Sequence, residues 1–129
     1  MYTPGMIINM SDNKYGLVLE TKDSYVKYLA VTPDLVGVKS NLGIYPLTRE
    51  YYHLGNNTPE VVYIHLDTIC IADGEFDIIG GLNSSKELID VLAILNGFRN
   101  YASSLQQTSN DITFSVNEVE EPVVLRKTV

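Results

Sequence analysis

The chain has 129 residues, of which 45% are hydrophobic, and this length and composition fit one globular domain with a sizeable core. Sixteen acidic residues outnumber nine Lys and Arg, giving a net charge of −7, so the average surface repels phosphate and disfavours nucleic-acid binding without a local basic patch. The single cysteine, Cys70, excludes an internal disulfide and is expected to be a buried, inert thiol.

The beginning of the sequence and its apolar runs bear on the compartment. The stretch MYTPGMIINMSDN lacks both the basic segment and the long apolar run of a secretory signal. No uninterrupted apolar run approaches the length that spans a membrane. The sequence therefore predicts a cytoplasmic protein that does not insert into a membrane.

The first two-thirds of the chain read as short strands. Residues 5–9, 15–20 and 25–31 are rich in apolar and aromatic side chains and are separated by polar turns. Residues 34–59 are less regular and predict a long loop with one or two short strands. Residues 61–71, VVYIHLDTICI, are rich in branched and aromatic residues and give the strongest strand signal.

A helix is predicted after two turns, one at Asp73-Gly74 and one at Gly80-Gly81. Ser84 can cap this helix, and Glu87, three residues later, completes a capping box. Gly97 either weakens the middle of the helix or ends it. Apolar residues at spacings of three and four predict one buried stripe: Leu88, Leu92, Leu95 and Phe98.

Five or six short strands followed by one helix predict a mainly β fold, a small barrel or curled sheet with the helix packed across one open face. Residues 1–105 form this domain, and residues 106–129 are a tail whose alternating 112–116 segment is suited to add a strand to its own barrel or to a partner's edge. The predicted core consists of Ile7, Leu17, Val18, Leu29, Val31, Val62, Ile64, Ile69 and Leu82, covered by Leu88, Leu92 and Leu95.

The segment VVYIHLDTICIADGEFDIIGGLNSSKELIDVLAIL resembles the C-terminal half of the MazF/PemK/Kid toxin family. In that family a leucine-acidic-x-isoleucine strand, a Thr-Ile-Asp-like turn, a short segment ending in G-x-L and a capped terminal helix follow one another. Leu66-Asp67-Thr68-Ile69, Ile71-Ala72-Asp73, Gly81-Leu82 and Ser84 to Leu95 occupy those places in order. Earlier, TPGMIINM, KYGLVLE and YVKYLAVTP resemble the family's first strands, so the resemblance covers roughly residues 3–100.

This resemblance implies an SH3-like barrel, usually dimeric, and in many members a growth-inhibiting toxin of a toxin–antitoxin pair that cleaves RNA with an Arg and a Thr. Carried over, the Thr falls on Thr32 and the Arg on Lys14, with Tyr15 in place of the neighbouring Pro. Lys is a point charge on a mobile stem, whereas Arg offers a fixed planar fork, so the change is not conservative. The family's long loop between the first two strands is reduced to SDN.

Two hypotheses of function follow. The first is a toxin-like barrel that binds a macromolecular partner, namely a protein, without ribonuclease activity, as small phage-encoded or mobile-element inhibitors of host proteins do. The acidic charge, the missing Arg and the short loop favour it. The second is a sequence-specific endoribonuclease with Lys14 and Thr32 at the scissile phosphate. Against it, Lys14 also reads as a solvated turn residue and Thr32 as an ordinary strand end. Neither hypothesis requires a cofactor.

Candidate partner-binding residues cluster in REYYHLGNN, where Arg49, Tyr51, Tyr52 and His53 lie together in an expected loop. Arg and Tyr anchor protein interfaces and stack on bases. The alternative is a loop whose tyrosines cover the barrel.

The remaining titratable residues carry weaker signals. His65, within the strongest strand, is expected to satisfy a local hydrogen bond rather than to act as a base. The carboxylates of Asp67, Asp73, Glu75 and Asp77 match no calcium-loop spacing, so we expect solvated turn residues and no metal site.

Overall fold

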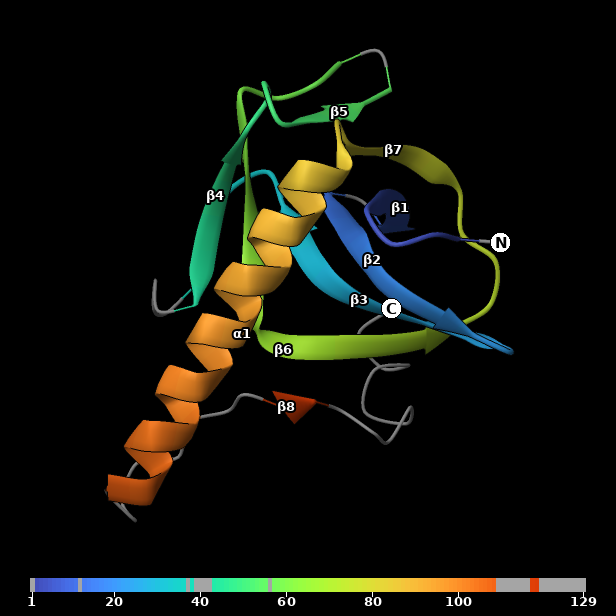
Figure 1. Cartoon of the computed structure of the whole chain (residues 1–129). Helices are drawn as coiled ribbons and strands as arrows, with labels where there is room; N and C mark the ends of the chain where they lie inside the picture. Colours follow the sequence, from blue (N-terminus) through green and yellow to red (C-terminus); the bar gives the residue numbers. More distant parts are fainter. Residues whose placement is uncertain are drawn as a thin grey trace.

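The computed structural model describes residues 2–11, 13–36, 38, 43–55, 57–108 and 117–118 (Figure 1). Within these residues the order of elements along the chain is β1 (Met6–Ser11), β2 (Lys14–Lys22), β3 (Tyr25–Thr32), β4 (Ile44–Thr48), β5 (Tyr52–Leu54), β6 (Val61–Asp73), β7 (Ile78–Leu82), α1 (Ser85–Thr108) and β8 (Asn117–Glu118).

The strands form one curled sheet in the order β4-β6-β3-β2-β1-β7-β5, and all neighbours on this path are antiparallel. The helix α1 crosses the open side of the curl (Figure 1). β8 pairs in parallel with Thr68 and Ile69 of β6. The predicted mainly β architecture, a small barrel-like sheet with a C-terminal helix packed on it, is therefore confirmed. The loop with one or two short strands that was predicted for residues 34–59 contains two, β4 and β5.

β6 bends sharply, so its two halves run in different directions within the sheet (Figure 1). Leu29 of β3 pairs with Ile69, whereas Val31 pairs with Ile64, so two steps along β3 match five along β6. Extra residues on one strand form a bulge, which bends the strand and redirects its side chains. His65 lies in this irregular part of β6.

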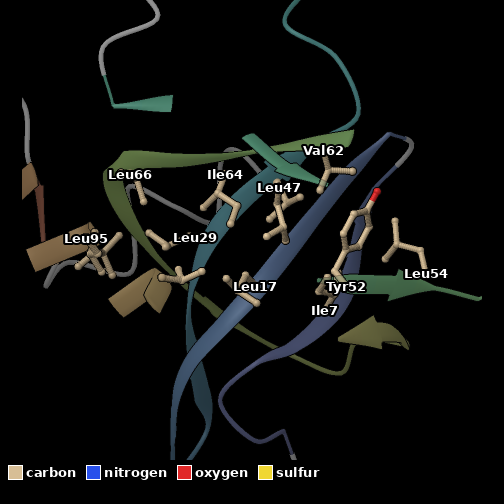
Figure 2. Packing of buried hydrophobic residues seen from close by; sticks show 13 residues of the cluster. Ile7, Leu17, Leu29, Leu47, Tyr52, Leu54, Val62, Ile64, Leu66 and Leu95 are labelled. Carbon is tan, nitrogen blue, oxygen red and sulfur yellow. The ribbon is translucent and has the colours of Figure 1, made fainter. Parts of the chain in front are cut away.

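The main core fills the inner face of the sheet, the face that α1 covers (Figure 2). Seven of the nine predicted core positions on the strands are buried in it, and Leu82 packs against it. Val18 is buried as well, but on the opposite, outer face of the sheet. The buried strand residues of this core are Ile7, Leu17, Leu29, Val31, Leu47, Tyr52, Leu54, Val62, Ile64, Leu66 and Ile69.

A second, smaller core covers the outer face. Tyr2 lies over it and both donates a hydrogen bond to the Phe76 carbonyl and accepts one from the Phe76 amide. Cys70 packs at this face and is half-buried rather than fully buried. Burial raises the pKa of the Cys70 thiol, which disfavours the reactive thiolate. The buried residues of this core are Ile8, Val18, Val26, Tyr28 and Ala72.

α1 begins where the sequence predicts, since Ser84 precedes its first residue and its hydroxyl bonds the Glu87 carboxylate. The buried residues of the helix are Val91, Leu95 and Ala102. Of the predicted stripe, Leu95 is buried, whereas Leu88, Leu92 and Phe98 are half-buried. An α-helix has 3.6 residues per turn, so Leu95, four residues after Val91, and Ala102, seven residues after Leu95, lie on the same inner face. Gly97 does not end the helix. Within the described residues, no helix combines the length and apolar character needed to cross a membrane.

The turn predicted at Gly80-Gly81 is wrong, because both glycines lie inside β7. A Cβ on Gly80 would lie 1.9 Å from the His53 carbonyl oxygen of β5. Gly80 therefore permits close approach of two backbones, which is the other common reason for glycine in a strand. The turn predicted at Asp73-Gly74 is confirmed, with Gly74 at a φ of 116°.

Candidate functional site: a polar pocket at Lys14, Thr32 and His65

A pocket of about 360 Å³ opens beside the turn that joins β1 to β2. It contains both residues that the family resemblance singles out, Lys14 and Thr32, together with His65. We call this feature the polar pocket. The described residues that line it are Ser11, Asn13, Lys14, Thr32, Asp34, Val36, Val38 and His65.

The pairing of β2 with β3 brings Lys14 and Thr32 together. Tyr15 pairs with Val31, and both pack into or against the inner core. Successive side chains on a strand point to opposite faces, so the adjacent Lys14 and Thr32 both belong to the outer face. The sequence separates these residues by a whole hairpin, but the antiparallel register makes them neighbours.

His65 reaches the same place from β6. Its neighbours Ile64 and Leu66 are buried in the inner core, so alternation directs His65 to the outer face. Its Nε2 lies 2.8 Å from Oγ1 of Thr32. The Thr32 hydroxyl donates to the backbone carbonyl of Asp34, also at 2.8 Å. Because a hydroxyl has one hydrogen, Nε2 carries the hydrogen of the imidazole and donates it to Thr32 in this arrangement, which leaves the lone pair on Nδ1.

Charges of both signs act on His65. Burial lowers the pKa of His65 below its ordinary value. The Asp67 carboxylate raises this pKa, and the Lys14 ammonium lowers it, but burial has the largest effect. A His pKa below the ordinary value means that the imidazole is neutral at pH 7. The polar pocket thus combines a cation, a hydroxyl and a neutral imidazole.

The structure does not bring the four candidate partner-binding residues onto one surface, because residues 52–54 form β5 rather than a loop. Tyr52 is 1% exposed, and its hydroxyl donates to the Pro59 carbonyl. Tyr51 is 43% exposed and lines a cavity of about 180 Å³ beside α1. His53 lines a different cavity, of about 420 Å³, and its Nδ1 lies 2.8 Å from Oδ1 of Asn83. Arg49 is exposed in the turn before β5.

The acidic residues of the β6–β7 region give no ligand set. Asp73, Glu75 and Asp77 are exposed. Within the described part of the chain, no group of three or more His, Cys, Asp or Glu residues is close enough to hold a metal ion.

Sequence reasoning did not place His65 in the site. With a regular register continued from Leu29 and Ile69, Thr32 would face Leu66, whereas the bulge makes it pair with Tyr63. The sequence offered one signal, an isolated His between Ile64 and Leu66 in the strongest strand. Which residue of another strand lies beside it depends on the bulge, and bulges of this size have no reliable sequence pattern.

Comparisons with protein families, with curated proteins and with solved structures give no significant match to this chain.

Proposed function

We propose that this chain binds a phosphodiester of single-stranded RNA in the polar pocket and cleaves it, as an endoribonuclease of the toxin type. One observation supports this most: Lys14 and Thr32, chosen from the family resemblance, line the same pocket and are joined there by His65. This reverses the order in which the sequence alone ranked the two hypotheses. The homodimer that the resemblance implies and the cytoplasmic location predicted from the sequence belong to the same proposal.

The chemistry of the three groups suits a phosphodiester. An ammonium group neutralises a phosphate oxygen and stabilises the charge that develops when the phosphorus is attacked. The Thr32 hydroxyl can donate to a second oxygen once it leaves the Asp34 carbonyl. A neutral imidazole nearby is the group that most often moves protons in enzymes at neutral pH. Cleavage in this pocket therefore does not require the fork of an Arg.

The negative charge of the chain limits how tightly RNA can bind. Among the described residues that line the polar pocket, Lys14 is the one Lys or Arg, and Asp34 is in the same lining. Phosphate contacts provide most of the affinity of proteins for nucleic acids, so one contact gives weak binding with a shallow salt dependence. We expect activity on short or accessible single strands rather than tight capture of long RNA.

The direct test is cleavage of a defined single-stranded RNA by the purified full-length chain and its variants. Lys14→Ala should lower the rate by about 10²–10³, the usual effect of losing one donor to developing charge. Lys14→Arg should retain or raise the rate. Lys22→Ala is the matched control, because Lys22 is an exposed lysine at the other end of β2 that pairs with Glu20. No cleavage by the wild-type chain, or equal loss in the control, contradicts the proposal.

The second candidate is binding of a protein partner, and the exposed apolar residues beside α1 favour it. Tyr51 borders a cavity with Lys86 and Asp90, and Ile89 on the outer side of the helix is 65% exposed. Aromatic residues beside a small cavity are common anchors of interfaces. A pull-down from bacterial lysate with and without nuclease separates the candidates. A partner that is retained after nuclease and lost with Tyr51→Ala supports protein binding, whereas nuclease-sensitive recovery supports RNA.

A further inference from the structure

We propose that His65 is the general base of the polar pocket, accepting at Nδ1 the proton of an RNA 2′-hydroxyl while Lys14 and Thr32 hold the adjacent phosphate. This role rests on the proposed RNA cleavage and names the group that carries out its proton transfer. The family resemblance assigns no function to His65.

The geometry positions the ring for this task. The bulge in β6 and the alternation of the strand place His65 on the outer face, in the lining of the polar pocket. The contact of Nε2 with Thr32 Oγ1, at 2.8 Å, fixes one side of the ring. A ring that donates through Nε2 has its lone pair at Nδ1, and it can gain a proton there without breaking the bond to Thr32. Protonation therefore requires no rearrangement of the site.

The reaction balances without a metal or cofactor. Nδ1 of His65 takes the proton of the 2′-hydroxyl, and O2′ forms a bond to phosphorus while the bond from phosphorus to the 5′-oxygen breaks. The 5′-oxygen leaves with a proton from water, and the imidazolium then returns its proton to the resulting hydroxide. The products are a 2′,3′-cyclic phosphate and a 5′-hydroxyl end. DNA, which lacks the attacking hydroxyl, is bound but not cleaved.

The charged groups around His65 keep its base form available. They are Asp67 on its own strand and Lys14 on β2, with Asp34 beyond the end of β3 in the same lining. Burial, supported by Lys14, lowers the pKa of His65 in spite of Asp67. A base whose pKa lies somewhat below the working pH is unprotonated and still able to accept a proton in the transition state. The rate should fall as the pH drops through that pKa.

The first experiment compares variants on a DNA oligonucleotide that contains one ribonucleotide. His65→Gln keeps an amide N–H that can donate to Thr32, but it cannot accept a proton. We expect its rate to fall by about 10²–10⁴, the usual contribution of a general base. His65→Ala should be equally slow and should recover part of its rate when imidazole is added, because imidazole can occupy the space that the side chain leaves. Thermal denaturation of each variant checks that it is folded.

The second experiment measures the wild-type chain, and the His65→Gln variant serves only to assign one resonance. The imidazole proton resonance of His65 is identified as the one missing in His65→Gln and is titrated with pH by NMR. The midpoint of this titration should coincide with the midpoint of the acid limb in the plot of cleavage rate against pH. An all-DNA oligonucleotide of the same sequence, which cannot be cleaved, should shift this resonance on binding.

The outcomes separate this inference from the proposed function. Loss of cleavage in His65→Gln, rescue of His65→Ala by imidazole and coinciding midpoints support the base. Cleavage that persists in His65→Gln with the same acid limb overturns the role of His65 and leaves RNA cleavage standing. If the all-DNA oligonucleotide shifts the His65 resonance but the chain does not cleave RNA, the role of His65 as general base is overturned and only phosphodiester binding remains. An unshifted resonance together with no cleavage overturns both.

Discussion

Lys14, Thr32 and His65 become neighbours through the backbone pairing of three strands and not through bonds that they make to each other. Lys14 and Thr32 lie beside the paired residues Tyr15 and Val31, and only the contact between Thr32 and His65 links two of the three side chains. None of the three is fully buried. Their substitution should therefore change the chemistry of the polar pocket while leaving the fold in place, which makes the pocket suitable for mutational tests.

The lowered pKa of His65 predicts how this residue changes stability with pH. The unfolded chain has an ordinary His pKa of about 6.5, so between the two pKa values the unfolded state binds more protons than the folded state. His65 therefore reduces the free energy of unfolding as the pH falls through this window, and its penalty is absent above it. Urea denaturation at about pH 7.5 and about pH 5 should show wild type losing more stability than His65→Gln. Parallel losses would contradict the shifted pKa.

Two glycines should respond oppositely to the same substitution. A Cβ at Gly80 would collide with the backbone of β5, so Gly80→Ala must separate β5 from β7 and should destabilise the protein by about 1–3 kcal/mol. Gly97 lies within α1 and has no atom near its would-be Cβ, so Gly97→Ala should stabilise by about 0.4–1 kcal/mol. Thermal denaturation of both variants measures the difference. Equal effects would mean that β5 and β7 do not approach as closely as described.

At the scale of elements, α1 is the piece whose packing closes the inner core. Leu95 is 5% exposed, whereas Ile89 on the same helix is 65% exposed. Leu95→Ala should therefore lower the free energy of unfolding by about 2–5 kcal/mol through lost burial and the cavity left behind. Ile89→Ala is the control and should change it by less than about 0.5 kcal/mol. Similar effects of both variants in urea denaturation would place a different face of the helix on the sheet.

The elements were predictable to the extent that their signals are local. Runs of apolar, branched and aromatic residues identified β2, β3 and β6, and Ser84 marked the start of α1. Gly80-Gly81 misled the prediction, because glycine indicates either a turn or a close backbone approach, and only the position of β5 distinguishes them. The predicted helical stripe was correct at Leu95 but included the half-buried Leu88 and Leu92 and missed Val91, since the sequence offers apolar residues on more than one side of α1. The bend of β6 and the approach of His65 to Thr32 arise from non-local pairing, which no local pattern encodes.

At the scale of the whole molecule, the sheet carries apolar cores on both faces. α1 covers the inner core, and the buried residues of the helix extend no further than Ala102 among those described. Tyr2 and Phe76 cover the outer core. Within the described part of the chain, the residues that close both cores precede the end of α1.

This arrangement predicts that the chain after α1 is dispensable for folding. A chain that ends at Thr108 retains every described residue of both cores and, among the contacts of the described residues, loses the pairing of β8 with Thr68 and Ile69. It should remain soluble and unfold cooperatively, with a midpoint close to that of the full chain, in agreement with a separable tail. Aggregation of the shortened chain would show that the tail belongs to the domain.

The polar pocket and the inner core occupy alternate residues of the same strands, and this has a consequence for ancestry. Selection can act on one set of positions while the other set stays constant, because neighbouring side chains face opposite sides of the sheet. Substitutions at the polar positions can replace one cationic residue by another, or introduce a histidine, while the fold stays unchanged. Descendants of this chain would share their apolar positions and diverge at the polar ones. Sequence similarity at the core positions would therefore persist after the activity had changed.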